Sequence, residues 1–155
     1  NENIAKTLGL NHLTILRSKV NPQFSDREIG SGIVGSFEQP ISEKEVMDIL
    51  KSKLSCEVIK HTNLLDRNVQ KMAICGGSGS FLLKDAMKTG ADIFLTSDFK
   101  YHEFFDADSK IVIMDIGHYE TEHLTKILLS EILCDKFHNF AAQYSKLNTN
   151  PVNYY

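Results

Sequence analysis

The chain has 155 residues, 42% hydrophobic and 24% charged, which is the composition of a soluble globular protein with room for one well-packed domain. Its net charge is −3, and its Lys and Arg residues are scattered, which argues against electrostatic binding to nucleic acid. Three cysteines without a CxxC pair, no signal peptide and no bilayer-spanning apolar run favour a cytoplasmic protein that does not enter a membrane.

The first half of the chain is predicted to alternate between helices and strands. Gly9 ends a short helix that begins with the first residue, which indicates a chain whose preceding part is missing. Ser42 is a favoured N-cap, and Glu45 completes a capping box with it. The expected elements are a helix over 1–9, a strand over 12–17, a loop over 18–32, a strand over 33–37, a helix from Ser42 to Leu54 and a strand over 56–61.

The second half of the chain has a more regular pattern. Apolar strand segments alternate there with helical segments, which predicts a single α/β domain over 1–155 with a mixed, largely parallel sheet flanked by helices. The expected elements are a strand over 72–75, a glycine turn over 76–80, a helix over 81–88, a strand over 91–96, a short helix over 98–106, a strand over 110–116, a long helix over 118–137 and a final strand over 140–147.

Polar or glycine-rich residues follow three of these strands, and the carboxyl ends of parallel strands meet at one edge of a sheet. Gly76–Ser80 has the composition of a phosphate-binding loop, because successive backbone N–H groups and a following helix N-terminus attract anions. It lacks the Lys-Ser/Thr of a P-loop and the full GxGxxG spacing. For the loop taken alone, a plain strand-to-helix turn that needs positive φ is therefore the favoured interpretation.

The second polar segment follows the strand over 91–96. Asp98 has an ordinary interpretation as a helix N-cap, and Lys100, Tyr101 and His102 have one as solvated helix residues. Their place at the same predicted sheet edge gives the alternative, which is a contribution to a binding site.

The strongest candidate is the pair of His118 and Glu122. They lie four residues apart at a predicted helix start, so both side chains project from the same face. The helix dipole explains acidic residues in a first turn, but it disfavours a cationic histidine there. A neutral His118 that acts as a metal ligand or a base fits better. Two ligands make only half of a metal site.

Three ordered stretches together resemble the NIF-three-like family of dinuclear-metal proteins, whose members are often named GTP cyclohydrolase type 2 homologues. The stretches are Cys75–Phe81, Gly90–His102 and Asp115–Glu122, and the tail Asn148–Pro151 is similar to the end of that family's chains. The resemblance extends over nearly the whole chain and is most specific from Ala73 to Glu122.

The resemblance implies a homohexamer with two divalent metal ions, of which Zn, Fe and Mn suit the ligands about equally. It implies that His118 and Glu122 are metal ligands and that His102 is a general acid or a donor behind the ligands. A small-molecule or nucleotide substrate would contact Gly76, Gly77, Ser78, Gly79, Lys100 and Tyr101 in the same cavity.

The family's remaining ligands are a His pair and an Asp that precede the stretch resembling residues 1–10, so they are absent from this sequence. His61 and Asp66 superficially echo the Asp motif at the wrong place in the order, and neither is assigned as a ligand. Many members carry an inserted domain where this chain has a short loop, so an insertion site is expected near 18–30.

Three functions remain open at this point. The first is a metal-dependent hydrolase that uses a metal-activated water. The second is a non-enzymatic, metal-binding hexameric scaffold or regulator, since fold and motif do not determine the reaction. The third is a nucleotide-binding domain that uses only the glycine loop.

Overall fold

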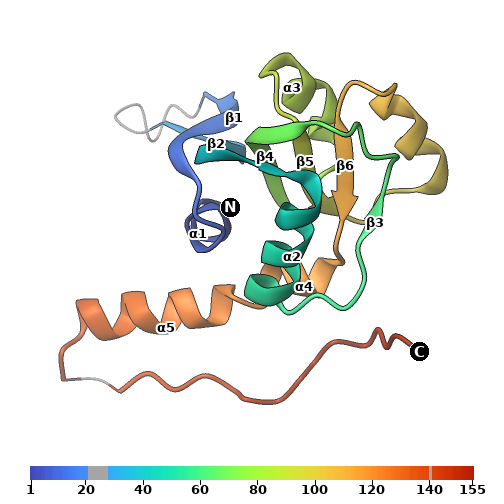
Figure 1. The fold of residues 1–155 in the computed structure, drawn as a ribbon. Helices are drawn as coiled ribbons and strands as arrows, with labels where there is room; N and C mark the ends of the chain where they lie inside the picture. Colours follow the sequence, from blue (N-terminus) through green and yellow to red (C-terminus); the bar gives the residue numbers. More distant parts are fainter. Residues whose placement is uncertain (21–27, 140) are drawn as a thin grey trace.

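The computed structural model describes residues 1–20, 28–139 and 141–155. The chain mixes helices and strands, and they alternate from β4 to α4 (Figure 1). The strands are β1 (Asn11–Lys19), β2 (Ile29–Ser42), β3 (Lys60–His61), β4 (Asn68–Ser78), β5 (Ile93–Ser97) and β6 (Val112–Asp115). The helices are α1 (Glu2–Thr7), α2 (Glu43–Leu54), α3 (Leu83–Lys88), α4 (His118–Glu122) and α5 (Thr125–Lys136), with 3₁₀ helices η2 (Ser80–Leu82) and η3 (Tyr101–Ala107).

The described strands form one mixed sheet in the order β1-β2-β4-β5-β6-β3. The pairs β4–β5 and β5–β6 are parallel, while β1–β2, β2–β4 and β3–β6 are antiparallel. This confirms the predicted α/β fold with a mixed sheet flanked by helices, and it confines the parallel part to the three central strands. Those strands are near-continuous apolar runs because both of their faces are covered.

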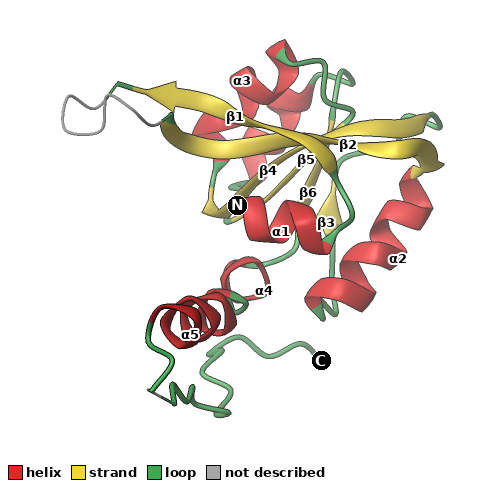
Figure 2. Ribbon diagram, turned by 90° about the vertical axis from the view of Figure 1, so that its left-hand side faces the viewer, coloured by secondary structure: helices red, strands yellow, loops and turns green. Residues whose placement is uncertain are grey.

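Helices cover both faces of the sheet (Figure 2). Helices α1, α2 and α4 lie over one face, and α3 and η3 lie over the other. The first core contains, among others, Ile4, Val46, Leu50, Leu54, Ile74, Leu95 and Met114, and the second contains Leu82, Ala86, Phe94, Phe99, Ala107 and Ile113. Alternate residues of each central strand therefore enter opposite cores, as the period of a strand requires.

The capping box predicted at the start of α2 is confirmed. The Ser42 hydroxyl accepts a hydrogen bond from the Glu45 backbone N–H at 3.2 Å, and the Ser42 N–H donates to the Glu45 carboxylate at 2.8 Å. The helix begins directly after this residue because two otherwise unpaired backbone donors find side-chain partners there.

The predicted loop over 18–32 is wrong at both ends. β1 runs to Lys19 and β2 starts at Ile29, because these two residues pair in the ladder between the strands. Residues 30–32 of the predicted loop lie in β2, and residues 21–27 lie outside the described residues. The expected insertion site near 18–30 falls mainly on them and stays a prediction.

The predicted strand over 56–61 is also too long. Only Lys60 and His61 form strand structure, because only they pair with the β6 backbone, at Asp115 and Met114. The short helix predicted over 98–106 is instead the 3₁₀ helix η3, which starts at Tyr101.

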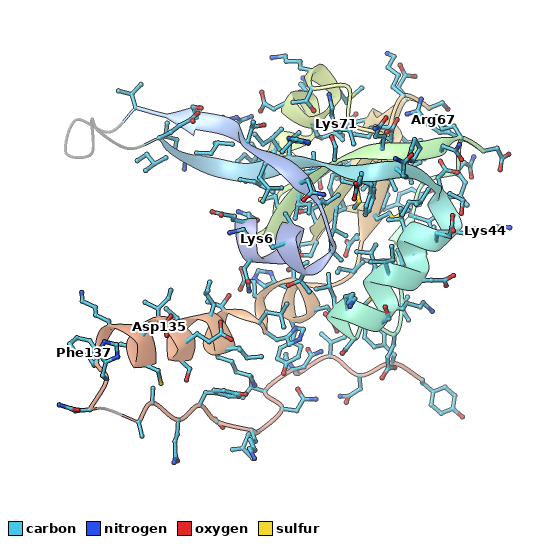
Figure 3. The ribbon with its side chains drawn as sticks, turned by 60° about the vertical axis from the view of Figure 1, so that its left-hand side comes forward. Lys6, Lys44, Arg67, Lys71, Asp135 and Phe137 are labelled. Carbon is cyan, nitrogen blue, oxygen red and sulfur yellow. The ribbon has the colours of Figure 1, made fainter. Side chains whose placement is uncertain are left out.

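The predicted single helix over 118–137 breaks at His123 and Leu124. α4 packs on the sheet with Thr121 buried, whereas α5 has no buried residue. Figure 3 shows α5 standing apart from the body, with Asp135 and Phe137 at its far end. The sheet therefore determines the direction of α4 but not that of α5.

The final strand predicted over 140–147 is wrong for residues 141–147, which have no regular structure, and Phe140 lies outside the described residues. Side chains of α5 hold this segment instead. Lys126 Nζ donates to the Ser145 carbonyl at 3.3 Å, and Ser130 Oγ donates to the Ala142 carbonyl at 3.4 Å.

Of the helices in the described part of the chain, none has the length and apolarity needed to cross a bilayer.

Candidate metal site at the ends of the parallel strands

The site lies at the edge where the three parallel strands end. Gly77 lies near the end of β4, Asp98 follows β5, and His118 begins α4 just after β6. The expected meeting of polar and glycine residues at this edge is therefore observed for these three positions. Ligands of open α/β sheets usually bind at such an edge.

His118 lies between two carboxylates. Its Nδ1 is 2.6 Å from Asp98 Oδ2, and its Nε2 is 3.2 Å from Glu122 Oε2. Because a carboxylate only accepts hydrogen bonds, Nδ1 carries the proton that faces Asp98. Nε2 faces the Glu122 carboxylate in the same way: it donates to that carboxylate when the ring is protonated and presents a lone pair there when the ring is neutral. All three side chains are about half exposed, so a ligand can reach this part of the surface.

The pKa of His118 is raised above its ordinary value of 6.5. The hydrogen bond that Nδ1 donates to Asp98 is the largest cause, and the negative charge of Glu122 adds to it, while partial burial opposes both. The carboxylates thus attract a positive charge to this point, which a proton or a metal ion supplies.

Gly77 forms the floor under this pair. Its φ is +67°, and its N–H donates to Thr121 Oγ1 at 2.9 Å, which fastens α4 to the sheet. A Cβ at this position would lie 2.6 Å from Glu122 Oε1 and 3.3 Å from His118 Nε2. A larger residue would push the Glu122 carboxylate aside, so glycine leaves both side chains where they lie.

The predicted glycine turn over 76–80 begins later than expected, because β4 extends to Ser78 with a register shift after Ile74. The Gly76 N–H donates to Asn1 Oδ1 at 2.7 Å, and the Gly77 N–H is bonded as described above. Two of the amides that would hold an anion are thus already paired within the chain. An anion-binding role for the loop stays a prediction.

Asp115 connects the two sides of the site from below. Its carboxylate accepts hydrogen bonds from the Phe99 N–H and the Gly117 N–H, both at 3.1 Å. One of these residues follows Asp98, and the other precedes His118. Lys60 Nζ lies 2.8 Å from the same carboxylate, and the side chain of Asp115 is fully buried. Asp115 therefore sets the spacing between the backbones that carry Asp98 and His118.

A cavity of about 720 Å³ opens over these residues, and the C-terminal tail forms one of its walls. Asn150 Nδ2 donates to the buried Glu120 at 3.3 Å, which anchors the tail there. The lining includes Lys60, Asp98, Asp115, His118, Glu122, His123, Asn150 and Tyr154.

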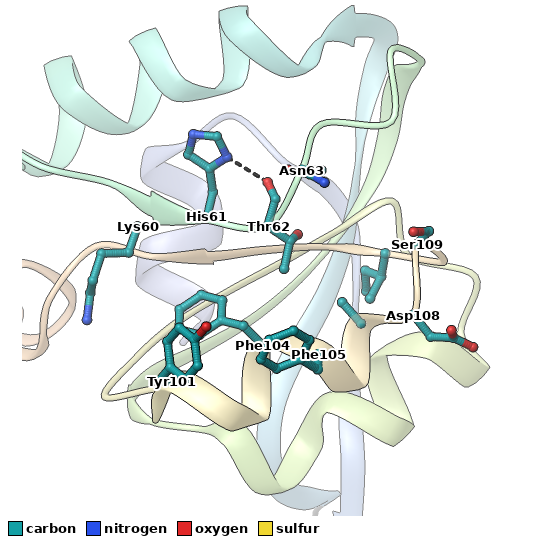
Figure 4. A pocket seen from close by; sticks show the side chains of 11 residues that line it. Lys60, His61, Thr62, Asn63, Tyr101, Phe104, Phe105, Asp108 and Ser109 are labelled. Atoms are coloured by element: carbon teal, nitrogen blue, oxygen red, sulfur yellow. Dashed lines mark hydrogen bonds between the residues drawn. The ribbon is translucent and has the colours of Figure 1, made fainter.

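The other predicted site residues lie outside this group. Tyr101 lines a second cavity, between η3 and residues 60–63, and Lys60 lines both cavities (Figure 4). His102 and Lys100 are exposed at the start of η3, where the Lys100 N–H donates to Glu103 at 2.9 Å. Their proposed roles toward a substrate remain predictions.

Asp115 and Lys60 were not predicted as members of the site. For Asp98, an N-cap and a contribution to a binding site were both left open. η3 begins three residues after it, at Tyr101, so Asp98 is not the N-cap, and its backbone takes φ +59°. The available signal was an Asp directly after one buried strand and at the end of the next, on the edge that also bears His118.

The donor set fits half of a metal site. His118 Nε2 and the Glu122 carboxylate are a nitrogen and an oxygen ligand on one helix face, and Asp98 orients the imidazole as carboxylates do behind metal-bound histidines. The space above Gly77, which a Cβ would fill, keeps both donors accessible. Within the described ranges, no three His, Cys, Asp or Glu side chains converge on one point, because Asp98 and Glu122 lie on opposite sides of the ring.

Comparisons with known proteins agree with the resemblance. A family model described as Duf34/NIF3 (NGG1p interacting factor 3) matches residues 1–151. A Staphylococcus epidermidis protein named GTP cyclohydrolase 1 type 2 homolog is 35% identical over 134 residues, which cover 83% of this chain and 36% of that protein. A Clostridium perfringens protein of the same name is 33% identical over 135 residues, which cover 84% of this chain and 49% of that protein.

Solved structures show the same fold. A Staphylococcus aureus protein superposes with a TM-score of 0.87 at 24% identity, over all of this chain and 64% of that one. A Bacillus cereus protein related to NIF3 gives 0.82 at 17% identity, over all of this chain and 69% of that one. The chain spans about a third to a half of the length of the curated relatives named above.

The fold and the site together define an α/β protein with a mixed sheet and a His–carboxylate pair at the ends of its parallel strands. The chain belongs to the Duf34/NIF3 family.

Proposed function

We propose that the protein binds two divalent metal ions and acts as a metal-dependent hydrolase of the GTP cyclohydrolase type 2-like kind. The observation that supports this most strongly is His118, held by Asp98 through Nδ1 while its Nε2 lies beside Glu122. Histidines that bind metal have this arrangement, in which a carboxylate fixes the tautomer and the direction of the ring.

His118 and Glu122 would be the ligands that this chain contributes. The family's remaining ligands, a His pair and an Asp, have no assigned counterpart in this sequence. Zn, Fe and Mn all accept an imidazole and a carboxylate, so the ligand types favour none of them. Bound divalent ions would lower the pKa of a water molecule so that it attacks a phosphoester, an amide or a purine-ring carbon.

The residues of the chain would orient the reactants. Asp98 would keep the His118 Nδ1 protonated and the ring fixed, and Asp115 would keep the two backbones in register. Lys60 would attract a negatively charged group of a small-molecule or nucleotide substrate into the cavity. A general-acid role for His102 is part of the proposal.

A second candidate function is a non-enzymatic, metal-binding hexameric scaffold or regulator. The observation that favours it is the exposed apolar surface of α5, where Leu129, Ile132, Leu133 and Phe137 are each 41% to 54% exposed. Apolar side chains in such numbers on an isolated helix are typical of a surface that another chain covers. Turnover of GTP or a phosphoester by the metal-loaded protein would distinguish the two functions.

We also propose a cytoplasmic location. Cys56, Cys75 and Cys134 are all free thiols, as is usual in a reducing compartment.

Metal analysis of the complete purified protein tests the ligand assignment. H118A and E122A should each lose most of the bound metal, whereas H138A, which removes an exposed histidine outside the site, should keep it. Unchanged metal content in H118A would overturn the proposal. Circular dichroism of each variant separates ligand loss from unfolding.

A further inference from the structure

We propose that the second cavity is a binding slot for a flat aromatic ring that carries a negatively charged group. The cavity lies between η3 and residues 60–63 and has a volume of about 560 Å³, within the usual range of small-molecule sites. The proposal deepens the proposed function by naming a ligand class for the region next to His118, and only the ligand's role as a substrate rests on that function.

Aromatic rings form one side of the slot. Tyr101 and Phe105 are 82% and 69% exposed, and their centroids lie 5.6 Å apart in an edge-to-face arrangement. Phe104 lies beside them and packs against the buried Phe99 at a centroid distance of 5.3 Å. The slot therefore has a fixed aromatic base with two ring surfaces open to solvent, and such rings bind other flat rings by stacking or edge contact.

The opposite wall is also fixed before any ligand binds. The Thr62 N–H donates to the Ile113 carbonyl at 3.2 Å, and the Ile113 N–H donates to Thr62 Oγ1 at 3.1 Å. These two bonds hold the segment to the central sheet through β6. Because both walls are held by buried elements, a ring can enter without a large ordering cost.

The charge of the slot lies at one end. Lys60 is 58% exposed and lies next to Tyr101, while its ammonium contacts the buried Asp115 at 2.8 Å (Figure 4). An ammonium has three donors, so one bond to Asp115 leaves two for a ligand. Lys60 also lines the cavity over His118, so a negative group bound there would face the candidate metal site.

Asp115 partly offsets the charge of Lys60, and the carboxylate that lines the slot itself, Asp108, lies away from that end. Asp108 lies at the far end, and its carboxylate is bonded to Lys110 at 2.6 Å, which lowers its pKa. His61 Nδ1 lies 2.7 Å from the Thr62 carbonyl, and Figure 4 shows its ring directed away from the three aromatic rings. Recognition thus requires both a ring and a charge, in one orientation.

Three probes separate these requirements. 2-Naphthoate has a flat ring and a charge, 2-naphthalenemethanol has the ring alone, and cyclohexanecarboxylate has the charge alone. Calorimetry and amide chemical shifts of the labelled protein in EDTA should show 2-naphthoate binding at residues 60–63 and 101–105. The other two probes should bind about tenfold more weakly, since each lacks one interaction of roughly that size.

Matched variants identify the residues. F105A and K60M should each weaken 2-naphthoate binding about five- to tenfold, in line with the probes. K60R keeps the charge and should retain binding even if K60M is unstable. F81A removes a 56% exposed ring outside the slot, and K6M removes a lysine that is paired with Glu2 at 2.7 Å, so both should bind normally.

The proposal is overturned if folded protein does not bind 2-naphthoate, if F105A binds it normally, or if the neutral and charged probes bind equally. It is also overturned if size-exclusion chromatography shows that the protein self-associates and the associated form does not bind 2-naphthoate. Because the titration is done without metal, a failure of metal binding leaves it unaffected. Normal metal content without probe binding would refute the slot alone.

Discussion

The carboxylate of Asp98 and the imidazole of His118 meet at 2.6 Å, although 20 positions separate them in the chain. Two parallel strands produce this contact. β5 and β6 end at the same edge of the sheet, where Asp98 follows β5 and His118 begins the helix after β6. Asp115 holds the backbones of the neighbouring residues Phe99 and Gly117, so the contact is built into the sheet.

Removing the Asp98 charge should lower the pKa of His118. The folded-state pKa lies above 6.5, chiefly because of this hydrogen bond, so the pair stabilises the fold fully below pH 6.5 and loses that effect as pH rises through the folded pKa. In D98N an NMR titration of His118 should give a lower pKa, and the decline of stability over this pH range should weaken. An unchanged pKa would show that the Asp98 contact does not operate in solution.

Gly77→Ala should destabilise the protein and disturb the site. The new Cβ would lie 2.6 Å from Glu122 Oε1 in a backbone with φ +67°, so we expect a loss of about 2–3 kcal/mol in a urea titration. Gly90→Ala is the control, because it has φ +70° with nothing within 4 Å of a Cβ. It should cost only the backbone strain, about 1 kcal/mol. Equal losses in the two variants would contradict close packing over Gly77.

Asp115→Asn should also be strongly destabilising. The substitution removes the charge that pairs with Lys60 and introduces an amide N–H₂ among hydrogen-bond donors, at a cost of about 2–4 kcal/mol for a fully buried group. Asp108→Asn removes an exposed carboxylate paired with Lys110 and should leave the unfolding midpoint unchanged. If thermal denaturation ranks the two variants equally, Asp115 does not hold the strand ends.

Ser42→Ala should lower the free energy of unfolding by about 1 kcal/mol, the usual value of a helix N-cap. Ser52→Ala removes a hydroxyl that bonds only the Ile49 carbonyl within the same helix, and it should change little. Chemical denaturation of both variants checks this, and an equal effect would argue against the capping box.

The sequence predicted the sheet well wherever local chemistry decides the outcome. The α2 cap, the buried bodies of β4, β5 and β6, and the meeting of polar residues at their ends follow from short-range pattern and strand period. The break between α4 and α5 did not follow, because no Pro or Gly interrupts residues 118–137. Tertiary packing of Thr121 on Gly77 holds only the first of the two helices.

The candidate site was predicted in part for a similar reason. His118 and Glu122 share one helix turn, so spacing alone places them together. Asp98, Asp115 and Lys60 come from three separate segments, and only the pairing of β3 with β6 and of β5 with β6 brings them there. The two aspartates leave a signal in their positions at strand ends, whereas the place of Lys60 depends on long-range register, which leaves no local signal in one sequence.

The central claim is that His118 Nε2 and Glu122 hold a metal ion. An anomalous difference map of crystals of the protein soaked in zinc tests it most directly. We predict a peak about 2.0–2.2 Å from both His118 Nε2 and a Glu122 oxygen, with Asp98 still on Nδ1. A peak that involves neither side chain, or none at saturating zinc, would contradict the claim.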